Sequence, residues 1–141
     1  AKANEPKRGA KLLKLIEPLM GDDSRYVRVN LGPFAISLAL LKNYPELTLK
    51  FLKKHASRKN EYGRWNVAMV WSAVGGRKYA ADGARLLDQL AADERRFVWR
   101  AVASAAVKLG KARPDVIKPL LMKWQSDPKR QHVAAVAKRY L

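Results

Sequence analysis

Cysteine is missing from the sequence, which excludes disulfide bonds, thiol chemistry and cysteine-based metal sites. Histidine is scarce: His55 and His132 are the only two, and neither has a partner at ligand spacing, so we expect no metal site and no cofactor. No apolar run reaches the roughly 18 residues of a membrane span, and no signal-peptide pattern opens the chain. The default expectation is a cytoplasmic protein without a membrane partner. Ala1 in place of an initiator methionine leaves open whether the chain is a piece of a longer protein.

Acidic residues are also few. Lys and Arg number 29 against 12 Asp and Glu, which gives the 141-residue chain a formal charge of +17. Because such an excess repels itself in a compact fold, it favours a polyanionic partner; a basic proteome or a solubility adaptation is the alternative. The hydrophobic fraction of 48% argues against general disorder, and the length suits one domain with a continuous core.

What the sequence does contain is an internal repeat. The segment Asp-Asp-Ser-Arg-Tyr-Val-Arg at 22–28 returns about 71 residues later as Asp-Glu-Arg-Arg-Phe-Val-Trp at 93–99, and each copy leads into an apolar helix and then a proline. Weaker copies at 61–65 and 127–131 set the underlying unit at about 35 residues, the length of a helical hairpin. Such periods are typical of α-solenoids, in which each unit buries its apolar face against its neighbours.

Apolar spacing inside the units predicts helices and no convincing strand. Gly32-Pro33 is expected to kink or split the helix that follows Ser24, and Trp71 and Trp124 are expected in the core. Other helices are predicted over 11–20, 46–55, 65–74, 84–91, 93–110, from 114 onward and over 129–141. Residues 1–9 are predicted to be a loose basic segment, and 10–141 a single domain. The pattern of a short helix, an aspartate turn and a helix opening aromatic-Val-x-Arg resembles HEAT-like repeats. The predicted fold class is therefore all-α, a HEAT-like solenoid of about four antiparallel helix pairs.

Positive charge gathers at one place in the repeat, the first turns of the second helix of each pair. There the backbone N–H groups of helix starts and the guanidinium groups can bind phosphate oxygens together, so we expect a basic edge on a concave face. The alternative for any one arginine is a salt bridge to an acid in a neighbouring turn, although the acids are too few to pair with all of them. With one tryptophan as a stacking contact, the candidate nucleic-acid-binding residues are Arg25, Arg28, Arg64, Trp65, Arg95, Arg96, Arg100, Lys129 and Arg130.

Two segments carry a more specific resemblance. Arg-Trp-Asn-Val-Ala-Met at 64–69 and Phe-Val-Trp-Arg-Ala at 97–101 resemble the motifs of the AlkD-type DNA alkylation-repair glycosylases. The resemblance implies an all-helical, HEAT-like solenoid that holds duplex DNA in a basic concave groove. Trp65 and Arg100 match the family's tryptophan and its second motif arginine, and their separation of 35 residues places them at equivalent positions of adjacent repeats.

The catalytic position of that motif differs in this chain. Met69 stands where the family has its aspartate, and Trp99 replaces the first arginine of the pair. A thioether can neither stabilise positive charge on a sugar nor orient water, so the resemblance implies the scaffold without the glycosylase activity. Glu61, one helical turn before Trp65, is the candidate for a substitute general base. No Ser-His-Asp set or glycine-rich phosphate loop can be assembled; Gly75-Gly76 is predicted to stop a helix.

Three hypotheses about function follow. The first is a DNA-repair-related protein that binds duplex DNA phosphates with little sequence specificity. The second is a protein-interaction scaffold whose concave face takes an acidic partner, and the third is an active alkylpurine DNA glycosylase. The choice between DNA and RNA and the oligomeric state stay open at this point.

Overall fold

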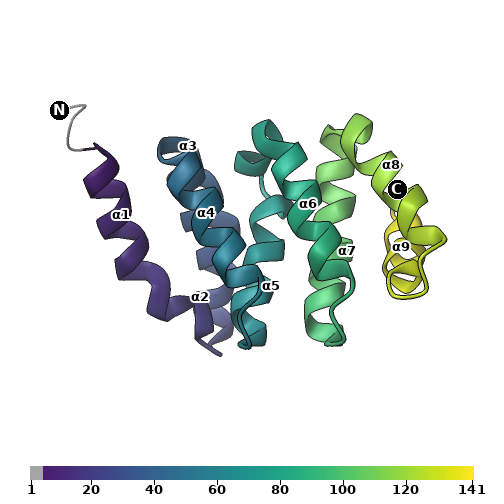
Figure 1. The fold of residues 1–141 in the computed structure, drawn as a ribbon, viewed down its shortest axis with the longest axis horizontal. Helices are drawn as coiled ribbons and strands as arrows, with labels where there is room; N and C mark the ends of the chain where they lie inside the picture. The colour runs from purple at the N-terminus through teal and green to yellow at the C-terminus, as the bar shows by residue number, and fades with distance from the viewer. Residues whose placement is uncertain (1–4) are drawn as a thin grey trace.

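A computed structural model of the chain describes residues 5–141, and every regular element in that range is helical (Figure 1). The α-helices are α1 (Glu5–Ile16), α2 (Arg25–Asn30), α3 (Leu41–Asn43), α4 (Pro45–Ala56), α5 (Glu61–Met69), α6 (Ala80–Ala91), α7 (Arg96–Ala112), α8 (Pro114–Gln125) and α9 (Gln131–Lys138). Short 3₁₀ turns occupy Glu17–Gly21, Val70–Ser72 and Val74–Tyr79, and a π-helical stretch, Leu31–Leu40, joins α2 to α3. The prediction of an all-α fold is confirmed.

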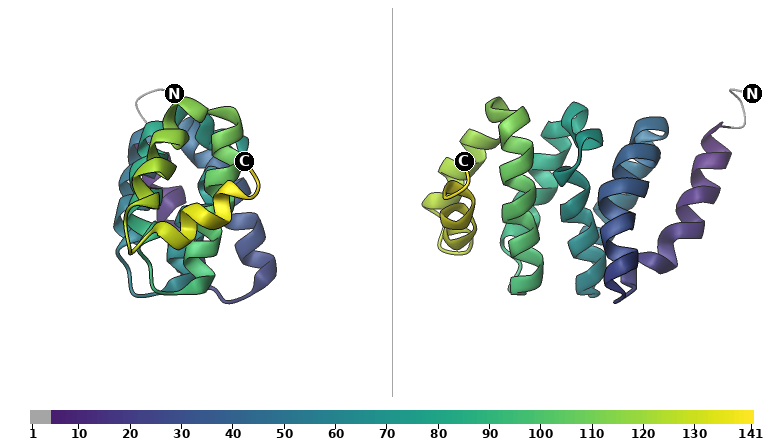
Figure 2. Two further views of the ribbon diagram at one scale, coloured as in Figure 1. Left: turned by 90° about the vertical axis from the view of Figure 1, so that its right-hand side faces the viewer. Right: turned by 180° about the vertical axis from the view of Figure 1, so that it is seen from behind.

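The helices pack in two rows (Figures 1 and 2). In one row α1 contacts α4, α4 contacts α6, and α6 contacts α8. The other row, called the α7 row below, consists of the π-helical stretch Leu31–Leu40, α5, α7 and α9, each in contact with the next. Contacts of α4 with α5, α6 with α7 and α8 with α9 connect the rows, and the main core lies between them.

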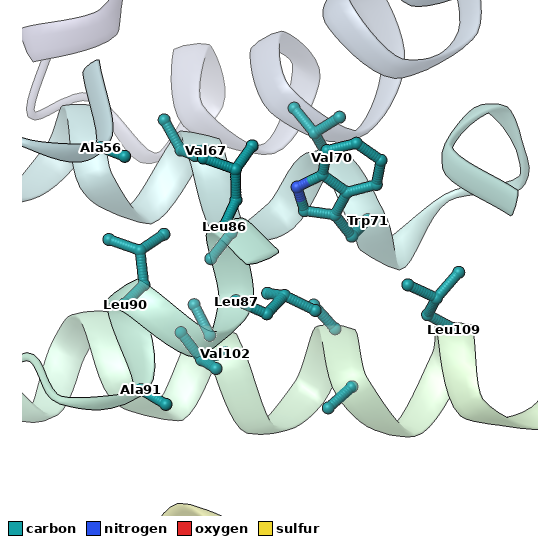
Figure 3. Close-up of a cluster of buried hydrophobic side chains, with 14 of the residues drawn as sticks. Ala56, Val67, Val70, Trp71, Leu86, Leu87, Leu90, Ala91, Val102 and Leu109 are labelled. Atoms are coloured by element: carbon teal, nitrogen blue, oxygen red, sulfur yellow. The ribbon is translucent and has the colours of Figure 1, made fainter. Parts of the chain in front are cut away.

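The core is continuous across neighbouring helices. Figure 3 shows side chains from α5, the turn after it, α6 and α7 converging, among them Val67, Val70, Trp71, Leu86, Leu87, Leu90, Val102 and Leu109. Trp71 and Trp124 are both fully buried, as the sequence predicts. A Cβ at Gly83 would lie 2.5 Å from the Trp71 ring, so this glycine lets α6 approach the indole.

Several helix boundaries differ from the sequence prediction because cap and proline signals lie elsewhere. Residues 5–9 are not loose: α1 begins at Glu5, Pro6 suits the first turn, and Gly9 is buried against Tyr44. The other residues of the predicted loose segment, 1–4, lie outside the described residues. Helix α5 begins at Glu61 rather than 65, because the Asn60 side chain accepts hydrogen bonds from the N–H groups of the next turn.

Two glycines that were predicted to end helices, Gly75 after α5 and Gly110 in α7, do not mark the observed helix ends. Helix α5 ends at Met69, before Gly75, whose Cβ would collide with the Ser37 carbonyl oxygen, so that glycine serves a close approach between elements. Helix α7 continues through Gly110 to Ala112, and the restriction that Pro114 places on the preceding residue accounts for its end. Helix α6 begins at Ala80, not at 84.

The helix that contains Gly32-Pro33 is not split. It runs from Arg25 to Asn43 because its central part, Leu31–Leu40, adopts π geometry, a wider turn in which the N–H group missing from Pro33 is accommodated. The Gly32 N–H group donates a hydrogen bond to Oδ1 of Asn66 at 3.2 Å. Asn66 is fully buried and its Nδ2 donates to the Met20 carbonyl, so one amide ties α5 to two earlier elements.

Candidate nucleic-acid interface

One exposed face of α7 carries a line of polar side chains, most of them cations. Arg96, Arg100, Ser104 and Lys108 follow one another at intervals of four residues and are exposed, whereas Val102 and the other core residues of α7 are buried on the opposite face. Four residues advance a helix by about 6 Å, so the side chains form a row along it. Helix α7 contains no acidic residue. We name this row, together with the exposed Lys111 in the last turn, the α7 stripe.

A hollow of about 600 Å³ lies beside the first half of the α7 stripe. Trp65 and Met69 of α5 line it on one side, and α7 lines the other. The residues from α7 are Arg96, Phe97, Arg100, Ala101 and Ser104. Trp65 and Arg100 therefore meet in one hollow, which we call the α5–α7 hollow, as their equivalent repeat positions predict. Among the described residues, those that line it carry no carboxylate.

A second hollow, of about 390 Å³, lies between α7 and the end of the chain. Its lining includes Lys108 and Lys111 of the α7 stripe and Tyr140 after α9. Arg100 and Ser104 line both hollows, so the two are continuous over the exposed face of α7. The residues of the stripe beyond Arg100 were missed at the sequence level, although their four-residue spacing from Arg96 was a usable signal.

Arg28 is held in an aromatic cluster rather than projected into solvent. Its guanidinium carbon lies 5.0 Å from the ring centroid of Tyr62, 5.1 Å from that of Phe97 and 5.8 Å from that of Trp65. One terminal nitrogen donates a 2.7 Å hydrogen bond to the Asp23 carbonyl oxygen. The position suits cation–π attraction, so Arg28 organises the aromatic side of the α5–α7 hollow.

Arg64 is committed to a structural ion pair. Its Nε lies 2.6 Å from Oδ2 of Asp93, and the two side chains are only 15% and 10% exposed. The same guanidinium donates to the carbonyl oxygens of Arg58 and Lys59, at 2.9 and 2.7 Å. With these partners in place Arg64 has little capacity left for a phosphate, which corrects the role predicted for it.

Arg130 is also occupied. Its terminal nitrogen lies 2.6 Å from Oδ2 of Asp127, and its Nε donates to the Asp88 carbonyl oxygen at 2.8 Å. Burial alone would raise the pKa of Asp88, but hydrogen bonds from Lys123 and Trp124 and the nearby charge of Arg130 lower it below its usual value. This group is a partly buried network that joins α6, α8 and the turn before α9, so Arg130 is a structural residue.

The remaining predicted residues lie at the edge of the α7 row. Arg25, Arg95 and Lys129 are exposed, and Nε of Arg95 lies 3.4 Å from Oε2 of Glu61. Glu61 is thus the partner of Arg95 at the start of α5 and does not line the α5–α7 hollow. Trp99 packs edge-on against His132, with ring centroids 4.7 Å apart, away from that hollow.

No family model matches the sequence, and no characterised protein or solved structure matches the chain significantly. Among residues 5–141, the helices are all too short or too polar to cross a lipid bilayer.

Proposed function

We propose that the chain is a HEAT-like α-solenoid that binds nucleic acid through its backbone phosphates, with duplex DNA as the first candidate. The observation that carries the proposal is the α7 stripe: Arg96, Arg100, Lys108 and Lys111 line one exposed helix face and form no ion pair within the described residues. Arginine and lysine at regular spacing suit a regularly charged polymer. The two rows of helices and the repeat of about 35 residues support the solenoid part.

The proposed binding is electrostatic and has little sequence specificity. Phosphate contacts fix position on a duplex but do not read its bases, and nothing in α7 resembles a helix that enters a groove. If the four cations of the stripe each neutralise a phosphate, the affinity falls with salt at a log–log slope of about −3.6, since each contact contributes about −0.9. A slope shallower than about −2 contradicts the stripe as the binding face.

The proposal includes a relation to DNA repair but no glycosylase activity. Trp65 and Arg100, the two matches to the AlkD-type motifs, line the α5–α7 hollow, which supports the relation. Met69 lies in the same hollow, and no lining residue supplies the carboxylate that excision requires. Glu61, the substitute candidate, is paired with Arg95 instead.

Fluorescence anisotropy of a labelled duplex across a salt series tests the proposal. Arg100→Glu places a negative charge in the middle of the α7 stripe, and we expect it to weaken binding at least tenfold at low salt. The matched control is Lys50→Glu, which makes the same charge change at an exposed position of α4, in the other row. Equal losses in the two variants, or no duplex binding by the wild type, would favour an acidic protein partner instead.

A further inference from the structure

The lining of the α5–α7 hollow combines two kinds of side chain. Trp65 and Met69 of α5 and Phe97 and Ala101 of α7 are aromatic or apolar, whereas Arg96 and Arg100 present guanidinium groups and Ser104 a hydroxyl. A surface that only binds phosphates needs cations but gains nothing from an aromatic and apolar wall. A wall of this kind beside paired arginines suits a ligand that is flat and apolar at one end and anionic at the other.

The aromatic side chains of the hollow, Trp65 and Phe97, are held in place by one another and by their neighbours. The Trp65 ring stacks on Phe97 with an interplanar angle of 15° and a centroid separation of 5.8 Å, and Tyr62 meets Phe97 edge-on at 5.5 Å. The guanidinium of Arg28 covers all three rings and is anchored to the Asp23 carbonyl. Because the indole is already fixed, a ligand that stacks on it loses little further conformational entropy.

We propose that the α5–α7 hollow binds an unpaired nucleobase, so that the preferred ligand is a nucleic acid with an unpaired nucleotide rather than a perfect duplex. This inference rests on the proposed function, because the α7 stripe must hold the strand that carries the base. The hollow, at about 600 Å³, is roomier than a nucleobase requires. A base swung out of its strand stacks on Trp65, while its phosphates lie against Arg96 and Arg100.

The chemistry of the hollow supports binding without reaction. Every base has a flat face, so stacking on an indole tolerates any base and adds affinity without reading sequence. In an intact duplex the bases are stacked inside the helix and cannot reach Trp65. The site therefore distinguishes unpaired nucleotides from paired ones. The Ser104 hydroxyl, which can donate or accept a hydrogen bond, adds a neutral polar contact on the α7 side of the hollow.

The experiment compares three labelled DNAs at one salt concentration by fluorescence anisotropy. They are a perfect duplex, the same duplex with one bulged adenosine, and that bulge with an abasic nucleotide in place of the adenosine. We expect the bulged adenosine to bind about tenfold more tightly than the perfect duplex, and the abasic bulge to bind like the perfect duplex. The abasic DNA keeps the bend of a bulge, so it separates capture of the base from recognition of shape.

Two variants, each with one tryptophan replaced by leucine, test whether the preference for the bulged adenosine comes from Trp65. Trp65→Leu removes the indole but keeps an apolar side chain, and we expect the ratio between its affinities for the bulged adenosine and for the perfect duplex to fall to about one. Trp99→Leu makes the same change at a half-buried tryptophan outside the hollow, and we expect it to keep the preference. Circular dichroism checks that both variants are folded.

A fluorescence measurement tests the base site even if the Trp65→Leu variant does not fold. In Trp99→Phe, Trp65 is the one tryptophan that is not fully buried, since Trp71 and Trp124 are both 0% exposed. Its emission is expected to be quenched by the bulged adenosine and not by the abasic bulge. Equal affinities for all three DNAs, or equal quenching, overturn the base site and leave the phosphate-binding function standing. Failure to bind any of the three overturns both.

Discussion

Arg64 and Asp93, 29 residues apart in the chain, form an ion pair of 2.6 Å that joins the first turns of α5 to the turn before α7. Both side chains are nearly buried, and Arg64 also bonds to the carbonyl oxygens of Arg58 and Lys59. The pair therefore fastens neighbouring helices of the α7 row at the end where binding arginines were expected from the sequence.

Removal of Arg64 is expected to destabilise the fold. Arg64→Ala leaves the Asp93 carboxylate and two carbonyl groups without their partner, and we expect the free energy of unfolding to fall by about 3 kcal/mol. Urea denaturation followed by circular dichroism measures this. Arg95→Ala is the control, because Arg95 is 68% exposed and its pair with Glu61 is worth less than about 1 kcal/mol. Equal losses in the two variants would contradict the structural role of Arg64.

Lys108 tests the far end of the α7 stripe, which the sequence analysis did not identify. Lys108→Ala is expected to make the salt dependence of duplex binding shallower by about 0.9 in log–log slope, as the loss of one phosphate contact predicts. The same substitution at Lys50 in α4 should leave the slope unchanged. If both variants keep the wild-type slope, DNA does not reach past Arg100, and the interface is confined to the α5–α7 hollow.

Two glycine substitutions are expected to have opposite effects on stability. A Cβ at Gly32 would lie 2.8 Å from the Asn66 carbonyl oxygen, so Gly32→Ala forces the π-helical stretch away from α5 and lowers the free energy of unfolding by about 1–3 kcal/mol. At Gly63 the nearest atoms to a new Cβ are 3.7 Å or more away, so Gly63→Ala raises it by up to about 1 kcal/mol through helix propensity. Thermal unfolding of both variants compares the signs, and a destabilised Gly63→Ala would show that α5 is packed more tightly than these distances allow.

The fold is expected to lose stability in mild acid because of His55. Burial lowers the pKa of His55 below its ordinary value of 6.5, although the carboxylate of Glu17, 3.3 Å from its Nε2, works in the other direction. A histidine whose pKa is lowered by folding is protonated first in the unfolded state, so its contribution is complete above pH 6.5 and is lost as the pH falls. The hydrogen bond from Lys54 lowers the pKa of Glu17 below 4.5, which adds a second loss in the same direction at lower pH.

Urea midpoints between pH 8 and pH 5 measure this dependence. We expect the wild type to lose stability from about pH 6.5 downward, and His55→Gln to be less stable but flatter over the same range. A wild-type midpoint that is constant from pH 8 to pH 5 would show that His55 keeps its ordinary pKa in the folded chain.

The sequence was sufficient for the parts of the structure that depend on periodicity. Apolar spacing identified the helices and the core positions of Trp71 and Trp124, and the repeat register placed Trp65 and Arg100 at one site. These inferences depend on the spacing of residues along a helix, which is fixed whatever the details of the turns between helices.

Other features could not be predicted, because they depend on contacts between units. Arg64 is paired with Asp93 and Arg130 with Asp88, carboxylates 29 and 42 residues away, and the sequence does not give the distances between such side chains. The hydrogen bond from Gly32, in the π-helical stretch, to Asn66, 34 positions away, likewise depends on how α5 packs and is not visible in the sequence. The start of α5 is a different case. Asn60 is a favoured N-cap residue and could have been recognised from the sequence, but it lies in a segment that was interpreted as a turn.

The network around Asp88 has a consequence for how the chain unfolds. Asp88 in α6 accepts hydrogen bonds from Lys123 and Trp124 of α8, and its backbone carbonyl accepts one from Arg130 before α9. A stack of repeats held only by local contacts frays from its ends, since each terminal unit has one neighbour. Here α8 and the turn before α9 are fastened to α6 by a partly buried polar network. Amide protons of α8 and α9 should therefore exchange in concert with those of α6, which makes the C-terminal half of the protein one cooperative block.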